Sequence, residues 1–181
     1  MRFRALVRRT GVRLLLLGIV ATALVTGAGN AQAAATTSVT SSGGVAFRLI
    51  PISSSHIMPQ DFLSCQIGGP IVSYTYATGE LDWQAGSQCN TTLRMQGSTK
   101  LFVWGSSNAF AWGNRYDGNY SSANSSGTAY SIFSGQWGVT INVLFFLPSG
   151  WTTNPSYACS WFDSAHTQLQ CSVTTGPVST Q

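Results

Sequence analysis

The sequence predicts an all-β fold, an antiparallel two-sheet β-sandwich of the Ig-like or jelly-roll-like kind, with roughly nine or ten strands and two disulfides. Apolar and polar residues alternate with a period of two along most of the chain, and Gly, Asn and Ser separate the alternating runs. No window of about a dozen residues shows a sustained helical stripe. The four cysteines can also be placed opposite one another on neighbouring strands.

The N-terminus has the pattern of a secretory signal peptide over residues 1–33. Five arginines and no acid come first, and an uncharged run of about a dozen residues follows, shorter than the ~20 apolar residues that span a bilayer. Ala31 and Ala33 form the A-x-A pattern that ends such segments. We therefore expect cleavage after Ala33 and a secreted, extracellular protein, with an uncleaved signal anchor as the alternative.

The exported chain is expected to form one domain over residues 45–176, preceded by a flexible N-terminus (34–44) and followed by a tail (177–181). A helical turn is predicted to begin at Pro59, and the Ser- and Asn-rich segment 121–127 is predicted to be a flexible loop. Further strands are predicted at residues 45–52, 91–96, 99–105, 109–116 and 128–133.

A first hairpin is predicted around a two-residue loop at positions 78–79. This register puts Tyr74 opposite Trp83 on an apolar face and leaves hydroxyl and acidic residues on the other face. A bulged turn would shift the register by one residue. The acids on the polar face are Glu80 and Asp82.

The clearest strand spans residues 137–147, because its alternation continues over the whole segment. The second half is apolar on both faces, so we expect Leu144 and Phe146 to lie under another layer. The predicted core face consists of Trp137, Val139, Ile141, Val143, Phe145 and Leu147.

A second hairpin predicts one disulfide directly. Folding the chain about Ala165 puts Cys159 opposite Cys171, with Tyr157 on the same side. Residues opposite each other in an antiparallel pair have Cα atoms about 4.5 to 5.5 Å apart, which suits a disulfide. Elimination then pairs Cys65 with Cys89, although the sequence leaves the crossed pairings open.

The charge of the chain changes on export. The formal net charge of +4 belongs to the whole chain, and removal of residues 1–33 leaves four basic and five acidic residues, a net charge of −1. Nucleic acids and anionic membranes are bound by clustered Lys and Arg, and the remaining basic residues form no cluster in the sequence. We therefore expect neither as a partner.

Motifs for catalysis or for metal and cofactor binding are not found in the sequence. It has no G-x-S-x-G elbow, no S-x-x-K, no phosphate-binding glycine loop, and no C-x-x-C or H-x-x-x-H spacing. Glu80 and Asp82 fall on one face of a strand, where two carboxylates could serve a small secreted hydrolase. The same spacing is typical of a solvated polar face.

The segment 112–120 has the composition of a recognition surface. It mixes Trp, Tyr, Asn, Arg and Asp around a predicted turn at positions 117–118, and rigid aromatic rings give contact area at low entropic cost. We therefore favour a non-enzymatic module that binds an extracellular glycan or protein surface, over the hydrolase and over a secreted inhibitor or structural surface protein. The candidate ligand-binding residues are Trp112, Arg115, Tyr116, Asp117 and Tyr120.

Overall fold

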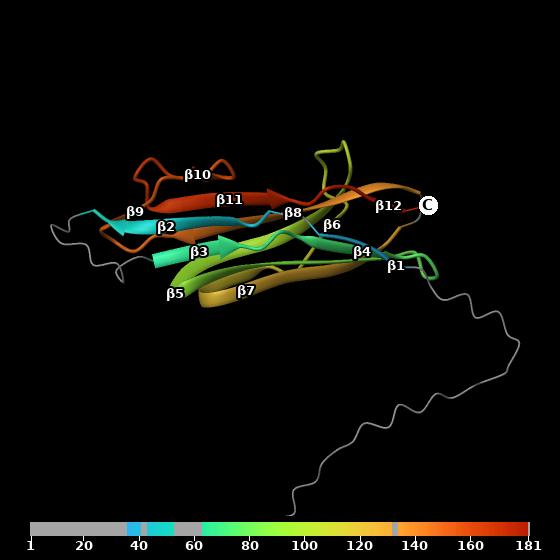
Figure 1. Cartoon of the computed structure of the whole chain (residues 1–181), viewed down its shortest axis with the longest axis horizontal. Coiled ribbons are helices and arrows are strands. Elements are labelled where there is room, and N and C mark those ends of the chain that lie inside the picture. Colours follow the sequence, from blue (N-terminus) through green and yellow to red (C-terminus); the bar gives the residue numbers. More distant parts are fainter. Residues whose placement is uncertain (1–35, 41–42, 53–62, 132–133, 181) are drawn as a thin grey trace, which may run out of the picture. The chain divides into compact units, whose positions relative to one another are not determined.

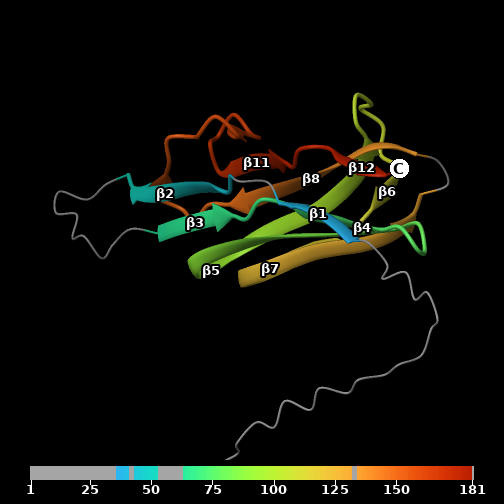
Figure 2. The same cartoon turned by 45° about the vertical axis from the view of Figure 1, so that its right-hand side comes forward.

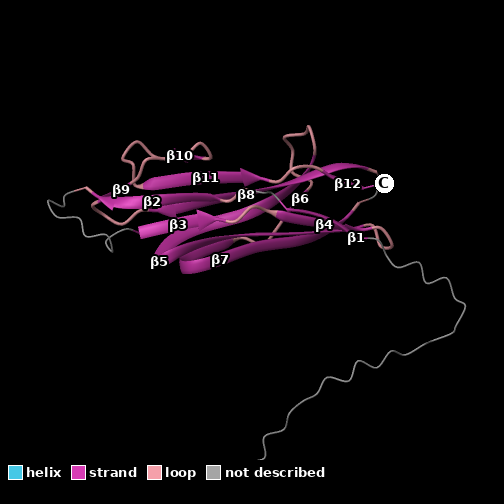
Figure 3. Ribbon diagram, viewed as in Figure 1, coloured by secondary structure: helices cyan, strands magenta, loops and turns pink. Residues whose placement is uncertain are grey.

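The computed structural model describes residues 36–40, 43–52, 63–131 and 134–180. All regular elements within these ranges are β-strands, which confirms the all-β prediction (Figure 3). A helix with the length and apolarity to cross a membrane is not found in the same ranges. The predicted signal peptide and the helical turn predicted at Pro59 lie outside the described residues.

Twelve strands occur in the described ranges, against the nine or ten predicted, and several have only two or three residues. The segment 91–96 and most of the segment 99–105, predicted as separate strands, belong to one strand of 24 residues that ends at Val103. In chain order the strands are β1 (Thr36–Thr40), β2 (Val45–Pro51), β3 (Leu63–Ile67), β4 (Ile71–Thr75), β5 (Glu80–Val103), β6 (Ala111–Trp112), β7 (Tyr116–Tyr130), β8 (Gly135–Phe146), β9 (Trp151–Thr152), β10 (Cys159–Trp161), β11 (Gln168–Thr174) and β12 (Val178–Thr180).

The strands form one antiparallel sheet organised around β5, and the predicted pair of sheets is not confirmed (Figures 1 and 2). β7 follows one edge of β5, while β4 and β3 pair with the first half of the other edge and β8 pairs with its second half. The register between β5 and β7 shifts between Gln88 and Leu93. The sheet curls into a half-barrel. Its two halves therefore face each other, as the two separate sheets of a sandwich would.

The core lies between the two halves of the curled sheet. Phe47 of β2 and Phe145 of β8 meet edge to face, with ring centroids 4.9 Å apart, although β2 is joined to the first half of β5 through β3 and β8 pairs with the second half. The core face predicted for residues 137–147 is confirmed, since all of its apolar residues are buried. Leu144 and Phe146 are only partly buried and lie on the outer face, so the covering layer predicted for them is not present among the described residues.

Several residues that the sequence pattern assigned to turns or tails lie inside strands. The predicted loop 121–127 and the predicted turn at 117–118 are both part of β7. Gly97 lies within β5, where a Cβ atom would be 2.3 Å from the Tyr116 ring, so this glycine makes room for a ring and does not mark a turn. β1 lies within the segment 34–44, predicted to be a flexible N-terminus, and β12 lies within the segment 177–181, predicted to be a tail.

The first hairpin has the predicted faces in a different register. Tyr74 lies opposite Leu81, and Val72 lies opposite Trp83, so the pairing is displaced by two residues from the predicted one. The connection is a four-residue turn over 76–79, closed by the Gly79 N–H donating to the Thr75 carbonyl at 2.9 Å. A shift of two residues keeps each side chain on its own face, which is why the faces were predicted correctly.

Both predicted disulfides are present, Cys65–Cys89 and Cys159–Cys171, and each joins residues directly opposite each other on paired strands. The prediction for Tyr157 is wrong. The pairing of β10 with β11 begins only at Cys159, so Tyr157 lies beyond the ladder and is 93% exposed.

Candidate ligand-binding face

The predicted binding patch is divided between the two faces of the sheet, because alternation along β7 turns Tyr116 and Tyr120 away from Asp117. Trp112 is 61% exposed, and Arg115 and Asp117 are also exposed. Tyr116 is only 7% exposed, and Tyr120 packs partly buried against the same core. The two tyrosines therefore lie on the inner face and are not part of an exposed patch with the other three residues.

Tyr116 has a structural role in the core. Its hydroxyl lies 2.9 Å from the Ser87 hydroxyl, and its ring meets the Tyr120 ring edge to face at 6.0 Å. Burial raises the pKa of the Tyr116 phenol, and the hydrogen bond with Ser87 opposes this in part. The phenol is held neutral inside the sheet and is not presented to a ligand.

The outer face of β5 and β8 carries a continuous polar surface that we call the outer strip. The register places its side chains in cross-strand rows that extend from β6 and β7 across to β11. From Lys100 to Arg94 the rows extend over about 20 Å along β5. The rows are Trp112, Lys100, Thr140 and Thr174; Ser98, Asn142 and Ser172; Asp117, Gln96, Leu144 and Gln170; and Asn119, Arg94, Phe146 and Gln168.

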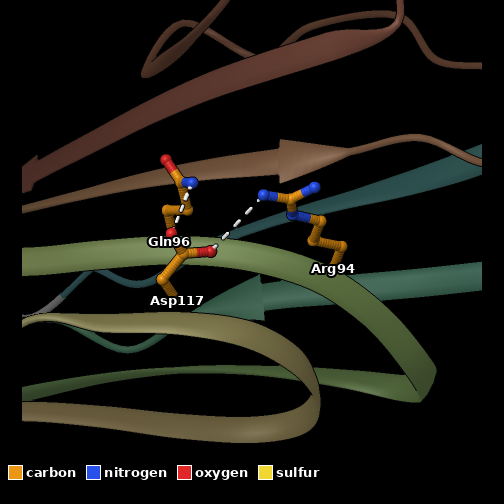
Figure 4. A network of polar contacts seen from close by, with 3 residues as sticks. All are labelled: Arg94, Gln96 and Asp117. Carbon is orange, nitrogen blue, oxygen red and sulfur yellow. Dashed lines mark hydrogen bonds and ion pairs between the residues drawn. The ribbon is translucent and has the colours of Figure 1, made fainter.

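Arg94, Gln96 and Asp117 form a group of polar contacts at one end of the outer strip (Figure 4). The Gln96 side-chain amide donates to Asp117 Oδ2 at 2.8 Å, and Arg94 Nη2 lies 3.8 Å from Asp117 Oδ1. The Arg94 guanidinium also lies over the Phe146 ring, 4.6 Å from its centroid. These contacts give this end of the strip one ring and one ion pair, both at the surface.

Aromatic rings gather at the other end of the strip, in a group that we call the aromatic corner: Trp112, Phe102 and Trp104. The rings of Phe102 and Trp104 stack at 6.0 Å with an angle of 22° between their planes. They lie over Gly138 of β8, where a Cβ atom would come within 2.5 Å of Phe102. Trp104 begins the connection to β6, which stands out from the sheet in Figure 2.

Phe102 and Trp104 are not among the binding residues predicted from the sequence. A usable signal was present in the predicted strand at 99–105, because Phe102 alternates with Leu101 and therefore faces outward beside Lys100. Lys100 Nζ lies 5.6 Å from the centroid of the Phe102 ring and donates to the Ser107 carbonyl at 3.2 Å. The lysine thus connects the aromatic corner to the loop above it.

A shallow hollow of about 150 Å³ lies in the middle of the outer strip. Arg115 and Phe162 both line it, together with amide and hydroxyl side chains of the strip. Arg115 makes no ion pair with any residue that the structure describes. The hollow is lined by Gln96, Gly97, Ser98, Arg115, Asn142, Val143, Leu144, Phe162 and Gln170.

The fold gathers positive charge that is dispersed in the sequence. After residue 33 the chain has four basic residues, and three of them, Arg94, Lys100 and Arg115, lie on or beside the outer strip. Arg48 is on β2, in the other half of the sheet. Asp117 is the one acid in the rows of the strip, whereas Glu80 and Asp82 lie at the start of β5, beside β4.

The two carboxylates of the hydrolase hypothesis are not brought together in the hollow that lies beside Asp82. A hollow of about 370 Å³ is lined by Asp82 but not by Glu80, and it holds no other acid. Asp82 Oδ1 accepts a hydrogen bond from the Thr128 hydroxyl at 2.6 Å. In the described ranges, no group of three or more His, Cys, Asp or Glu side chains is arranged to hold a metal ion.

A larger hollow, of about 630 Å³, lies over β2, β3 and β5 in the other half of the sheet. Its polar lining includes Arg48, Gln66, Gln88 and Asn154. The one aromatic residue in its lining is Phe47, which is buried in the core. This hollow therefore offers hydrogen bonds but no exposed ring on which a ligand could stack.

The turn between β10 and β11 is fixed by local contacts. The Asp163 carboxylate accepts hydrogen bonds from the Thr167 hydroxyl and from the backbone N–H groups of Thr167 and Gln168. The bond with the Thr167 hydroxyl is the main cause of the lowered pKa of this carboxyl. His166 adopts a positive φ of 56° and stacks on Trp161 at 4.7 Å. In the same turn the Phe162 backbone N–H donates to the Gln168 carbonyl at 2.9 Å, which places Phe162 beside the outer strip.

Comparison of the chain with protein-family models, with curated proteins and with solved structures finds no match. The function is therefore inferred from the side chains of this chain alone.

Proposed function

We propose that the protein is a secreted, non-enzymatic module that binds an extracellular glycan through the outer strip. The observation that carries this proposal is the position of the exposed ring of Trp112 in a cross-strand row with Lys100 and Thr140. Sugars present apolar C–H faces and polar hydroxyl edges, so they are recognised by exposed rings next to hydroxyl and amide groups.

The polar rows of the strip support a glycan over a protein partner. Side chains such as Ser98, Asn142 and Gln170 both donate and accept hydrogen bonds, which matches the hydroxyl groups of a sugar. Protein interfaces usually have an apolar core that excludes water. In the middle of the strip, Leu144 is the one aliphatic side chain among hydroxyl and amide groups.

An extracellular location is part of the proposal. The two disulfides are consistent with an oxidising compartment, since such bonds form and persist outside the cytosol. The signal-peptide pattern of residues 1–33 supports the same location. A binding surface made of hydroxyl, amide and aromatic groups suits a ligand that is met outside the cell.

The experiment is a glycan array and a pull-down on immobilised polysaccharides, using protein recovered after secretion of the full chain. Trp112→Ala should weaken glycan binding about tenfold or more, because truncation of an aromatic ring that contacts the ligand commonly costs ~2 kcal/mol. Tyr130→Ala is the matched control, since Tyr130 is 60% exposed on β7, opposite Glu80 and away from the strip. Equal binding by wild type and Trp112→Ala would contradict the proposal.

A further inference from the structure

We infer that the glycan is acidic, with a sugar carboxylate bound by Arg115 in the hollow at the centre of the outer strip. This inference rests on the proposed function and adds the chemical class of the ligand. The guanidinium group has a planar set of donors that matches the two oxygens of a carboxylate. Arg115 is exposed and lines the hollow of about 150 Å³.

The surroundings of Arg115 complete a site for one charged sugar. Gln96, Ser98 and Asn142 line the same hollow and offer hydrogen bonds to hydroxyl groups. Phe162, which is 60% exposed, also lines it and offers a ring for the apolar face of the sugar. A cation, neutral polar groups and an aromatic ring therefore surround one small volume.

The other two basic residues of the strip are already engaged, which distinguishes Arg115 from them. Arg94 contacts Asp117 and the Phe146 ring, and Lys100 contacts the Ser107 carbonyl and the Phe102 ring. Arg115 has no acidic partner among the described residues, so a ligand carboxylate can pair with it without displacing one. Arg115 is thus the specific anchor, and the other two cations add a long-range attraction.

The charge distribution favours an acidic chain over a neutral one. The exported protein has a net charge of −1, yet the outer strip has more basic than acidic groups because Glu80 and Asp82 lie at the other end of β5. An acidic polysaccharide is attracted to this face and repelled by the remainder of the surface. The strip is about 20 Å long, so a chain of several sugar units can lie along it.

The experiment compares each acidic polysaccharide with a form of the same chain whose carboxylates carry no charge. The probes are polygalacturonate, alginate and hyaluronan, each beside its methyl ester, in which the carboxylates are blocked, with dextran as a neutral chain. Binding to protein from the full chain is measured at low and at high salt. At least one acidic probe should bind about tenfold more tightly than its ester, and high salt should weaken that binding.

Substitutions then locate the carboxylate. Arg115→Gln should reduce the affinity for the acidic probe about tenfold and the affinity for its ester by less, since only the carboxylate forms charge-assisted hydrogen bonds with the guanidinium. Arg115→Lys should recover only part of the loss, because lysine keeps the charge without the planar set of donors. Arg48→Gln, in the other half of the sheet, is the control and should bind like wild type.

The possible results separate this inference from the proposed function. If the esters or dextran bind as tightly as the acidic chains, the glycan function stands and the acidic ligand is overturned. An acidic preference that Arg115→Gln does not change, or that Arg48→Gln removes, overturns the placement at the hollow. If neither these probes nor the glycan array bind, the proposed function itself fails.

Discussion

The hydroxyl oxygens of Tyr116 and Ser87 lie 2.9 Å apart inside the curled sheet, between β7 and the first half of β5. Tyr116 is the first residue of β7, and its neighbour Asp117 is exposed. Successive side chains of a strand point to opposite faces, so a core residue and a surface residue are adjacent here. The inner side of this strand stabilises the fold, and its outer side belongs to the candidate binding face.

Burial of Tyr116 predicts a loss of stability at alkaline pH. The pKa of its phenol is raised above the ordinary value of 10.0, so above pH 10 the folded state holds a proton that the unfolded state releases. This contribution to stability is complete below the unfolded pKa and disappears as pH rises through the folded pKa. Wild type should therefore lose stability more steeply above pH 10 than Tyr116→Phe, as measured by urea unfolding over a pH series. Parallel curves for the two proteins would contradict the prediction.

One methyl group added at Gly97 should lower the free energy of unfolding substantially. Because a Cβ atom at this position would lie 2.3 Å from the buried Tyr116 ring, Gly97→Ala must displace the ring or the strand. We expect a loss of about 1 to 3 kcal/mol in the free energy of unfolding, typical of overpacking in a core. Gly43→Ala is the control, since nothing lies within 4 Å of its Cβ position. Similar stability of the two variants would show that the ring moves at little cost.

The contact between Arg94 and Phe146 should contribute only modestly to stability. The guanidinium lies 4.6 Å from the ring centroid at the surface, where a cation–π contact contributes about 0.5 to 1 kcal/mol. A double-mutant cycle with Arg94→Ala and Phe146→Ala, measured by urea unfolding, should give a coupling energy of that size. A coupling energy near zero would mean that the two side chains lie side by side without attraction.

The parts of the fold that follow from alternation could be predicted from the sequence. The core face that begins at Trp137 and the pairing of Cys159 with Cys171 depend only on which side of a strand each residue lies. The length of β5 could not be predicted in this way. Gly97 has the signature of a strand break, and only the Tyr116 ring, 19 positions along the chain, explains why a glycine lies within the strand.

The candidate site was predicted in part for a related reason. Trp112 and Asp117 were selected by composition, but the turn predicted at positions 117–118 concealed the alternation that places Tyr116 on the opposite face. Arg94 and Lys100 reach the same surface only through the register of β5 with β7, β6 and β8. Composition can identify the type of a binding residue, whereas the register decides which of those residues share a face.

Removal of either disulfide should lower the stability of the protein, and the loss should be greater for the bridge that closes the longer loop. Cys65 and Cys89 are separated by 24 positions and Cys159 and Cys171 by 12, and each bridge joins directly opposite residues of an antiparallel pair. If the bridges act mainly on the entropy of the unfolded chain, each should contribute about 2 to 4 kcal/mol, and the longer loop should contribute about 0.6 kcal/mol more. Urea unfolding of the Cys65→Ser/Cys89→Ser and Cys159→Ser/Cys171→Ser double variants, each against wild type, measures both costs. An inverted order would mean that packing around the second bridge, which lies against β8, contributes more than the difference in chain entropy.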